Sequence, residues 1–169
     1  MNTKQNKSRS TALTVIGRAE RIELVDFGLT GVPSKVDTGA DTSSMWASDI
    51  VRNETTGELS FKLFGSVSEF YTGESISLKR GDYDVTRVAS SNGHRQVRYA
   101  VTLRIRLHGR TVRTTFTLTD RSHRTYPVLL GRRLLHKKFL VDVSRGDPLT
   151  DLEKVKRDNM RLALNGLLN

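Results

Sequence analysis

Apolar and polar residues alternate in short runs over the first 145 positions of this chain. The longest run covers residues 99–107, which are followed by the turn signal His108-Gly109 and by further apolar positions up to residue 119. A period of two places alternate side chains on opposite faces of a strand. The pattern predicts a hairpin with one buried face and one face rich in arginine. The residues of its first strand that should be buried are Tyr99, Val101, Leu103, Ile105 and Leu107.

Other short runs, bounded by glycine, proline and asparagine, indicate more strands. Residues 13–17 and 21–27 have strand character, and the Asn92-Gly93 dipeptide predicts the tip of a second hairpin. Residues 53–82 are mixed in character and indicate an elaborated loop with up to two strands. We therefore expect an all-β fold in a single domain without internal repeats.

The two ends of the chain differ from this pattern. Residues 1–11 are basic and polar, and we expect them to be disordered. Near the other end, Pro148 precedes a possible capping box formed by Thr150 and Glu153, and Gly166 is a plausible stop. These signals predict a helix over residues 151–165. Its apolar positions are Leu152, Val155, Leu162 and Leu164.

The formal net charge of +10 is concentrated in one segment. Residues 94–138 contain twelve lysines and arginines against a single acid, Asp120. Such a field favours a polyanionic partner, which could be nucleic acid, an acidic peptide or a membrane surface. A well-solvated basic face without a partner explains the same pattern, and composition alone does not decide between them.

Cysteine is absent, which excludes a disulfide framework and a cysteine nucleophile. No apolar run has the length of a signal peptide or of a membrane span. We therefore expect a cytoplasmic protein that does not enter a membrane.

The stretch "VDTGADTSSMW" at residues 36–46 places Asp37, Thr38 and Gly39 directly after an apolar residue. These residue types form ordinary turns, so the triplet alone favours a turn over a catalytic loop. Two later features change that balance. An Asn-Gly-tipped hairpin follows, and then the apolar run "YPVLLGRRLL" brings two leucines before Gly131 and Arg132.

The three segments "KVDTGADTSS", "VASSNGHRQVRY" and "LLGRRLLHKKFLVDVS" occur in the order found in retropepsin-like aspartic proteases. They most closely resemble a bacterial branch that is often labelled putative ATP-dependent zinc protease. The resemblance covers roughly residues 13–145. It implies a closed barrel with a flap hairpin over residues 12–148, followed by a C-terminal helical segment at 149–169.

The resemblance also implies roles for individual residues. Asp37 would be catalytic, supported by Thr38 and Gly39, and Asp41 would pair with Arg132 while Gly131 packs beside the acid loop. The residues expected to border or contact the substrate are Ala40, Asp41, the flap tip Ser90, Ser91, Asn92 and Gly93, and then Arg95 and Arg98.

Aspartic proteases need two carboxylates that share one proton, because one activates water while the other protonates the carbonyl oxygen. The sequence contains a single Asp-Thr-Gly, so one chain supplies half of such a site. A homodimer follows, in which the Asp37 residues of two subunits meet at a twofold axis. The predicted C-terminal helix replaces the terminal strand with which viral enzymes dimerise, so the mode of association stays open.

The label of this bacterial branch names zinc and ATP, and the sequence supports neither. There is no His-Glu-x-x-His motif, and His94, His108, His123 and His136 lack close ligand spacing. There is also no phosphate-binding P-loop motif. We expect neither a metal nor another cofactor.

The leading hypothesis is an aspartic endopeptidase that acts as a homodimer on acidic or glutamate-rich peptides. Genes of this family tend to lie beside ATP-grasp ligases that add glutamates, and Arg95 and Arg98 would meet the flanks of an acidic substrate. The alternative is a non-catalytic nucleic-acid or ribosome-binding protein on the same barrel.

Overall fold

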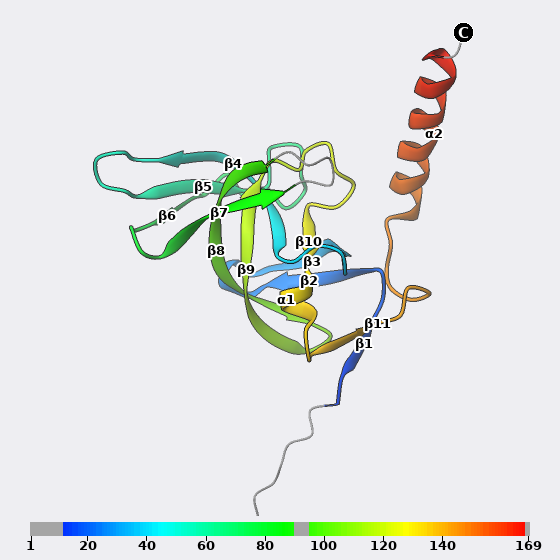
Figure 1. The fold of residues 1–169 in the computed structure, drawn as a ribbon, viewed down its shortest axis with the longest axis horizontal. Coiled ribbons are helices and arrows are strands. Elements are labelled where there is room, and N and C mark those ends of the chain that lie inside the picture. The colour runs from blue at the N-terminus through cyan, green and yellow to red at the C-terminus, as the bar shows by residue number, and fades with distance from the viewer. Residues whose placement is uncertain (1–11, 90–94, 168–169) are drawn as a thin grey trace, which may run out of the picture.

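The computed structural model describes residues 12–89 and 95–167 of the 169-residue chain. Within these residues the chain is mainly β-structure, as Figure 1 shows. The strands before the predicted hairpin are β1 (Thr14–Ile16), β2 (Ala19–Leu24), β3 (Leu29–Val36), β4 (Ser43–Arg52), β5 (Leu59–Leu63), β6 (Ser75–Leu78) and β7 (Tyr83–Ala89). The remaining elements are β8 (Arg95–Leu107), β9 (Arg110–Thr119), β10 (Val128–Leu130), β11 (Phe139–Val141), the 3-10 turn η1 (Val25–Phe27), and the helices α1 (Arg132–Leu135) and α2 (Thr150–Leu167).

The main sheet closes on itself through β10. Its strand order is β10-β3-β2-β8-β9-β4-β5-β6, and β10 also pairs with β4. Because β10 runs parallel to β3 and antiparallel to β4, it joins the two ends of a strand ring. The expected all-β fold with a closed barrel and a C-terminal helix is confirmed.

The hairpin of β8 and β9 forms as predicted. Buried and exposed residues alternate along 101–107, and strand pairing runs from Ala100 with Thr117 to Leu107 with Arg110. His108 and Gly109 both have positive φ (47° and 74°), as a tight two-residue hairpin turn requires. The inward residues join a core that includes Phe116, Met45 and Ile105, all essentially inaccessible to solvent.

Strand β4 was not predicted from the sequence. Its first five residues, Ser43 to Ala47, are all buried, so no alternation marks them. The reason is tertiary: β4 lies between β9 and β10 in the ring, and its polar Ser43 and Ser44 are buried together with Met45. The mixed segment 53–82 does contain two strands, β5 and β6, as expected.

The β7–β8 hairpin pairs from Tyr83 with Val101 to Ala89 with Arg95. The expected flap tip, Ser90, Ser91, Asn92 and Gly93, lies outside the described residues.

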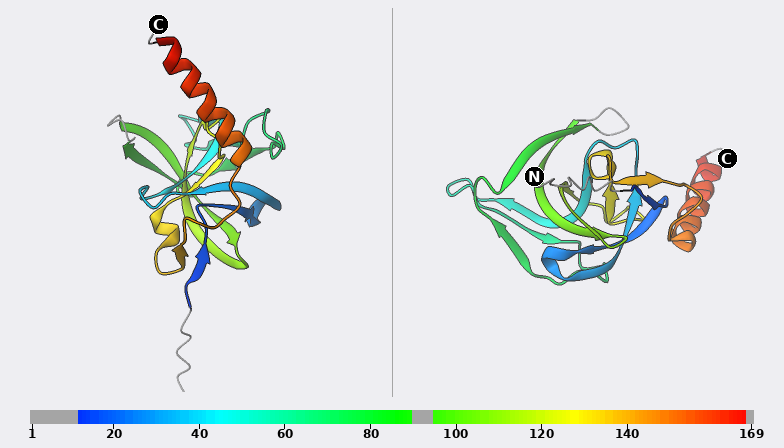
Figure 2. Two further views of the ribbon diagram at one scale, coloured as in Figure 1. Left: turned by 90° about the vertical axis from the view of Figure 1, so that its right-hand side faces the viewer. Right: turned by 90° about the horizontal axis from the view of Figure 1, so that it is seen from below.

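The helix predicted over 151–165 is observed as α2, which continues past Gly166. Figure 1 and the right-hand view of Figure 2 show α2 projecting to one side of the barrel. Its apolar residues Leu152, Val155 and Leu162 are accordingly exposed. The Glu153 carboxylate accepts hydrogen bonds from Arg18 and Tyr126, instead of turning back to the helix start as a capping box would. Within the described part of the chain, neither helix has the length and apolarity needed to cross a bilayer.

Candidate active site

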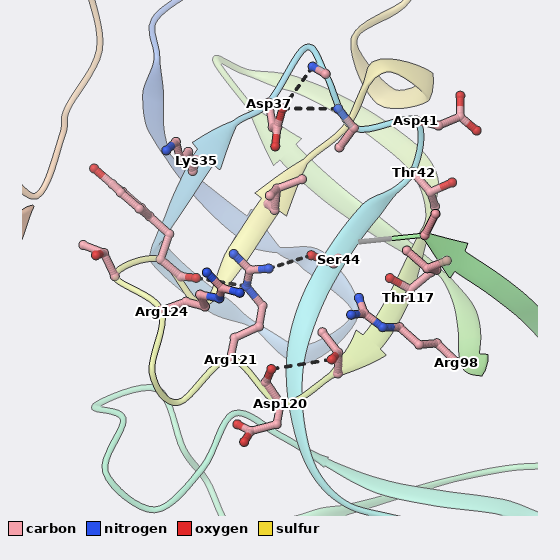
Figure 3. Close-up of a pocket in the computed structure, with 18 of the residues that line it drawn as sticks. Lys35, Asp37, Asp41, Thr42, Ser44, Arg98, Thr117, Asp120, Arg121 and Arg124 are labelled. Carbon is pink, nitrogen blue, oxygen red and sulfur yellow. Dashed lines mark hydrogen bonds between the residues drawn. The ribbon is translucent and has the colours of Figure 1, made fainter. Parts of the chain in front are cut away.

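The acid loop begins where β3 ends. Asp37 N–H donates to the carbonyl of Leu130 (3.0 Å), which ties the loop to β10. Its carboxylate Oδ1 accepts hydrogen bonds from the backbone N–H groups of Gly39 (2.9 Å) and Ala40 (3.2 Å). Figure 3 shows the two hydrogen bonds that run from the backbone of the loop to this carboxylate. Backbone donors fix the Asp37 carboxylate without a side-chain cation.

Gly131, which follows β10, packs against the other end of the acid loop. A Cβ at this position would lie 2.6 Å from the carbonyl carbon of Thr42 and 2.9 Å from Ser43 N. Gly131 N–H also donates to the Ser43 hydroxyl (3.0 Å), and Arg132 N–H donates to the carbonyl of Ala40 (2.8 Å). No side chain fits between these backbones, so glycine is required for the close approach.

Asp41 lies at the surface beside two arginines. Its carboxylate is 2.7 Å from Arg133 and 3.4 Å from Arg132, the partner expected from the resemblance. All three side chains are more than half exposed, so these ion pairs contribute little stability. The backbone bonds from Arg132 to Ala40 and from Arg133 N–H to the carbonyl of Asp41 (3.1 Å) hold the two loops together more firmly.

A cleft of about 1160 Å³ opens in front of Asp37. It is bordered by the acid loop, the β7–β8 hairpin, the loop between β9 and β10, and the first turns of α2. Gly39, Ala40, Asp41 and Arg132 line it, whereas Thr38 is exposed and does not. Of the two arginines expected to meet substrate, Arg98 lines the cleft and Arg95 is exposed outside its lining.

Two cleft residues, Arg121 and Arg124, were not singled out from the sequence. They follow β9 in a turn closed by a hydrogen bond from Arg124 N–H to the carbonyl of Arg121 (2.8 Å). Arg121 donates from Nε to the carbonyl of Tyr126 (3.1 Å) and from a terminal nitrogen to the Ser44 hydroxyl (3.0 Å). The segment "RSHR" lies three residues before β10, which ends next to Gly131. This position was the available signal that the segment borders the same cleft.

The electrostatics of the cleft are dominated by these arginines. Burial and the neighbouring Arg124 and Arg98 lower the pKa of Arg121 to about 10, although the charge of Asp37 opposes the shift. Burial, followed by the charge of Arg124, also lowers the pKa of Arg98. Three guanidinium groups therefore lie close enough to repel one another beside the acid loop (Figure 3).

A second network anchors α2 at the rim of the cleft. Glu153 accepts two hydrogen bonds from Arg18 (3.1 and 3.0 Å) and one from the buried Tyr126 hydroxyl (2.9 Å). The hydrogen bond from Arg18 is the main cause that lowers the pKa of Glu153, against the opposing effect of desolvation. Burial raises the pKa of Tyr126, whose hydroxyl also accepts a hydrogen bond from Leu149 N–H (2.9 Å).

No group of three or more histidine, aspartate or glutamate side chains in the described residues could hold a metal ion. Over residues 12–89 and 95–167, the hydrogen bonds to the Asp37 carboxylate come from the backbone N–H groups of Gly39 and Ala40.

Known proteins share this architecture. A solved structure of a protein of unknown function from Legionella pneumophila has a TM-score of 0.61 and 28% identity, covering 80% of this chain and 97% of that one. A curated relative from Shewanella pealeana, named "Probable alpha-L-glutamate ligase", is 34% identical over 134 residues. A relative of the same name from Parasynechococcus marenigrum is 28% identical over 165 residues.

These matches cover 77% and 93% of this chain, but only 28% and 34% of the two relatives. The chain therefore spans about a third or less of the curated relatives it matches. The family model described as "Retropepsin-like aspartic endopeptidase RimB" matches residues 15–147, which include the acid loop, the β7–β8 hairpin and Gly131. This chain belongs to the RimB-like family of retropepsin-like aspartic endopeptidases.

Proposed function

We propose that this protein is an aspartic endopeptidase that acts as a homodimer, with one catalytic Asp37 from each subunit, on acidic or glutamate-rich peptides. The observation that carries the proposal is the Asp37 carboxylate, which is oriented by Gly39 and Ala40 and lines a cleft of about 1160 Å³. Two such carboxylates sharing a proton supply the base that activates water and the acid that protonates the peptide carbonyl.

Among the described residues that line the cleft of one chain, each carboxylate other than Asp37 is already bound by other side chains or backbone groups. Asp41 pairs with Arg132 and Arg133, and Glu153 is bound by Arg18 and Tyr126. Asp120, the remaining acid of the cleft lining, accepts hydrogen bonds from the backbone N–H and hydroxyl of Ser122 (2.8 and 3.1 Å). A second copy of the chain is therefore the natural source of the partner acid, and the exposed Thr38 and Gly39 lie free to meet it.

The charge of the cleft supports an acidic substrate. Ten lysines and arginines line it against four acids, so a peptide rich in lysine would be repelled. The name of the curated relatives refers to glutamate ligation, which is consistent with a peptidase that acts on glutamate-rich chains. We expect the cytoplasm to be the site of this reaction.

The nucleic-acid alternative receives less support from the arrangement of the basic hairpin. Arg104 pairs with Asp26 and Arg106 pairs with Glu23, each at 2.7 Å. Two arginines of the basic hairpin are thus neutralised within the chain, while Arg98 of the same hairpin lines the cleft.

The decisive experiment mixes wild-type protein with the Asp37→Asn variant before assaying cleavage of a polyglutamate peptide. If each active site needs two Asp37 residues, turnover should fall with the square of the wild-type fraction, whereas independent sites give a linear fall. Asp37→Asn alone should be inactive yet retain the wild-type melting temperature. Near-wild-type turnover by that variant would refute the assignment.

A further inference from the structure

We propose that the guanidinium groups of Arg98, Arg121 and Arg124 form a binding site for one side-chain carboxylate of the substrate, beside the Asp37 carboxylate. The inference rests on the proposed function, because it assigns the residue of the peptide that lies next to the cleaved bond. Recognition then depends on Arg98 of β8 and on two arginines of the loop between β9 and β10, and not on Arg95, which lies outside the cleft lining.

The three guanidinium groups come from two elements that face each other. Arg98 extends from the β7–β8 hairpin, and Arg121 and Arg124 extend from the turn after β9 (Figure 3). None of the ion pairs among the described residues includes any of the three. Three neighbouring cations without an acid repel one another, and a bound anion would relieve that repulsion.

Arg121 is held in place before any ligand binds. Its bonds to the carbonyl of Tyr126 and to the Ser44 hydroxyl fix the plane of the guanidinium group. A guanidinium group has five N–H donors, so several remain for a ligand. A rigid group with donors to spare binds a carboxylate at a lower cost in side-chain entropy than a flexible surface arginine does.

The nearest acid of the cleft does not fill this role. Asp120 precedes Arg121 in the chain, but both of its carboxylate oxygens accept hydrogen bonds from Ser122. Asp120 also lines a second hollow, together with Trp46 and Tyr71. The cluster is therefore left open towards the cleft that contains Asp37.

A carboxylate fits this site by chemistry and by position. Guanidinium groups bind carboxylates through two parallel hydrogen bonds, and a glutamate side chain is long enough to reach past the peptide backbone. The three arginines line the same cleft as Asp37, so a peptide bound there can contact both. A free carboxylate or phosphate ion offers related chemistry, and the experiment separates these sources.

The test measures equilibrium binding to the full-length Asp37→Asn protein, so that it does not depend on turnover. Labelled tetraglutamate and tetraglutamine peptides are titrated, and unlabelled glutamate and inorganic phosphate serve as competitors. We expect tetraglutamate to bind and tetraglutamine to bind far more weakly. Arg124→Gln and Arg98→Gln should each weaken tetraglutamate binding about ten- to a hundred-fold, as loss of a charge-assisted hydrogen bond does.

Arg113→Gln is the matched control, because it removes the same charge from an exposed residue of β9 that does not line the cleft. Its binding should stay within about two-fold of the parent, as expected for a screened distant charge. Arg124 is the primary variant because Arg121→Gln also removes the bonds to Tyr126 and Ser44 and could disturb the fold.

Three results would overturn the inference: unchanged binding by Arg124→Gln and Arg98→Gln, an equal loss in Arg113→Gln, or phosphate competing as well as glutamate peptides do. In the catalytically active protein, Arg124→Gln should raise KM for a glutamate substrate more than it lowers kcat. Failure of cleavage with intact, arginine-dependent binding would refute the peptidase and leave the carboxylate site standing.

Discussion

Gly131→Ala tests whether the close packing of two loops shapes the acid site. The new Cβ would lie 2.6 Å from the carbonyl carbon of Thr42, 2.8 Å from its oxygen and 2.9 Å from Ser43 N. Ordinary contacts begin near 3.5 Å, so one backbone must move by roughly 1 Å. Because all three atoms belong to the backbone, no side-chain rotation relieves the clash.

Overpacking of this kind costs about 1–3 kcal/mol, which corresponds to a fall of about 2–12 °C in the melting temperature of a chain of this size. The effect on activity should be larger. Gly131 N–H donates to Ser43, and Arg132 N–H donates to Ala40, so a shift here carries the acid loop with it. A misplacement of about 1 Å can lower turnover about a hundred-fold.

Thermal unfolding and peptide cleavage should be measured together, with Gly109→Ala as the control. Gly109 has a φ of 74° in the β8–β9 turn, and a Cβ there meets no atom within 4 Å. Alanine in that conformation costs about 1–2 kcal/mol through backbone strain alone, so stability should fall while turnover is retained. Wild-type stability and turnover in Gly131→Ala would refute the packing argument.

Three further predictions concern the core, the α2 anchor and metal dependence. Phe116→Ala should destabilise the fold by about 3–5 kcal/mol in urea unfolding, because this side chain is fully buried in the barrel. Glu153→Gln should lower stability by about 1 kcal/mol at neutral pH, because the carboxylate is stabilised by Arg18. Because the pKa of Glu153 is lower in the folded protein than in the unfolded chain, its carboxylate stabilises the fold at pH values above the ordinary glutamate pKa. The difference in stability between wild type and Glu153→Gln should therefore vanish as the pH falls below about 4. A constant difference in melting temperature down to about pH 3 would contradict this. Peptide cleavage should be unaffected by EDTA; loss of activity with recovery on adding zinc would contradict a dyad that uses carboxylates alone.

The alternation of apolar and polar residues predicted those strands that have one buried face and one solvent-exposed face. The β8–β9 hairpin is the clear example, because residues 101–107 alternate in burial as they alternate in sequence. Strand β4 escaped detection because ring closure buries Ser43 to Ala47 in succession. Burial of that kind depends on β9 and β10, which are distant in the chain.

The same distinction applies to the site. The acid loop and Gly131 are carried by short motifs, and the structure brings them together because β10 pairs with β3 directly before both loops begin. No sequence motif marks the cluster of Arg98, Arg121 and Arg124. Arg98 approaches Arg121 and Arg124 only because the β7–β8 hairpin and the turn that follows β9 border the same cleft. Charge in the sequence alone could not distinguish these arginines from Arg104 and Arg106, which form ion pairs on the outer face.

The arginines of the cluster lie near Asp37 without bonding to its carboxylate, and this arrangement matters for the proposed reaction. A guanidinium group bonded directly to Asp37 would occupy the carboxylate that, in the proposed mechanism, binds water and exchanges a proton. The structure avoids this contact, because Asp37 accepts hydrogen bonds from the backbone of Gly39 and Ala40, while Arg121 is turned towards Tyr126 and Ser44. The two charges still act on each other through space. In the proposed mechanism, a substrate carboxylate bound to the cluster would offset the positive charge of the arginines and leave the Asp37 carboxylate to its backbone donors.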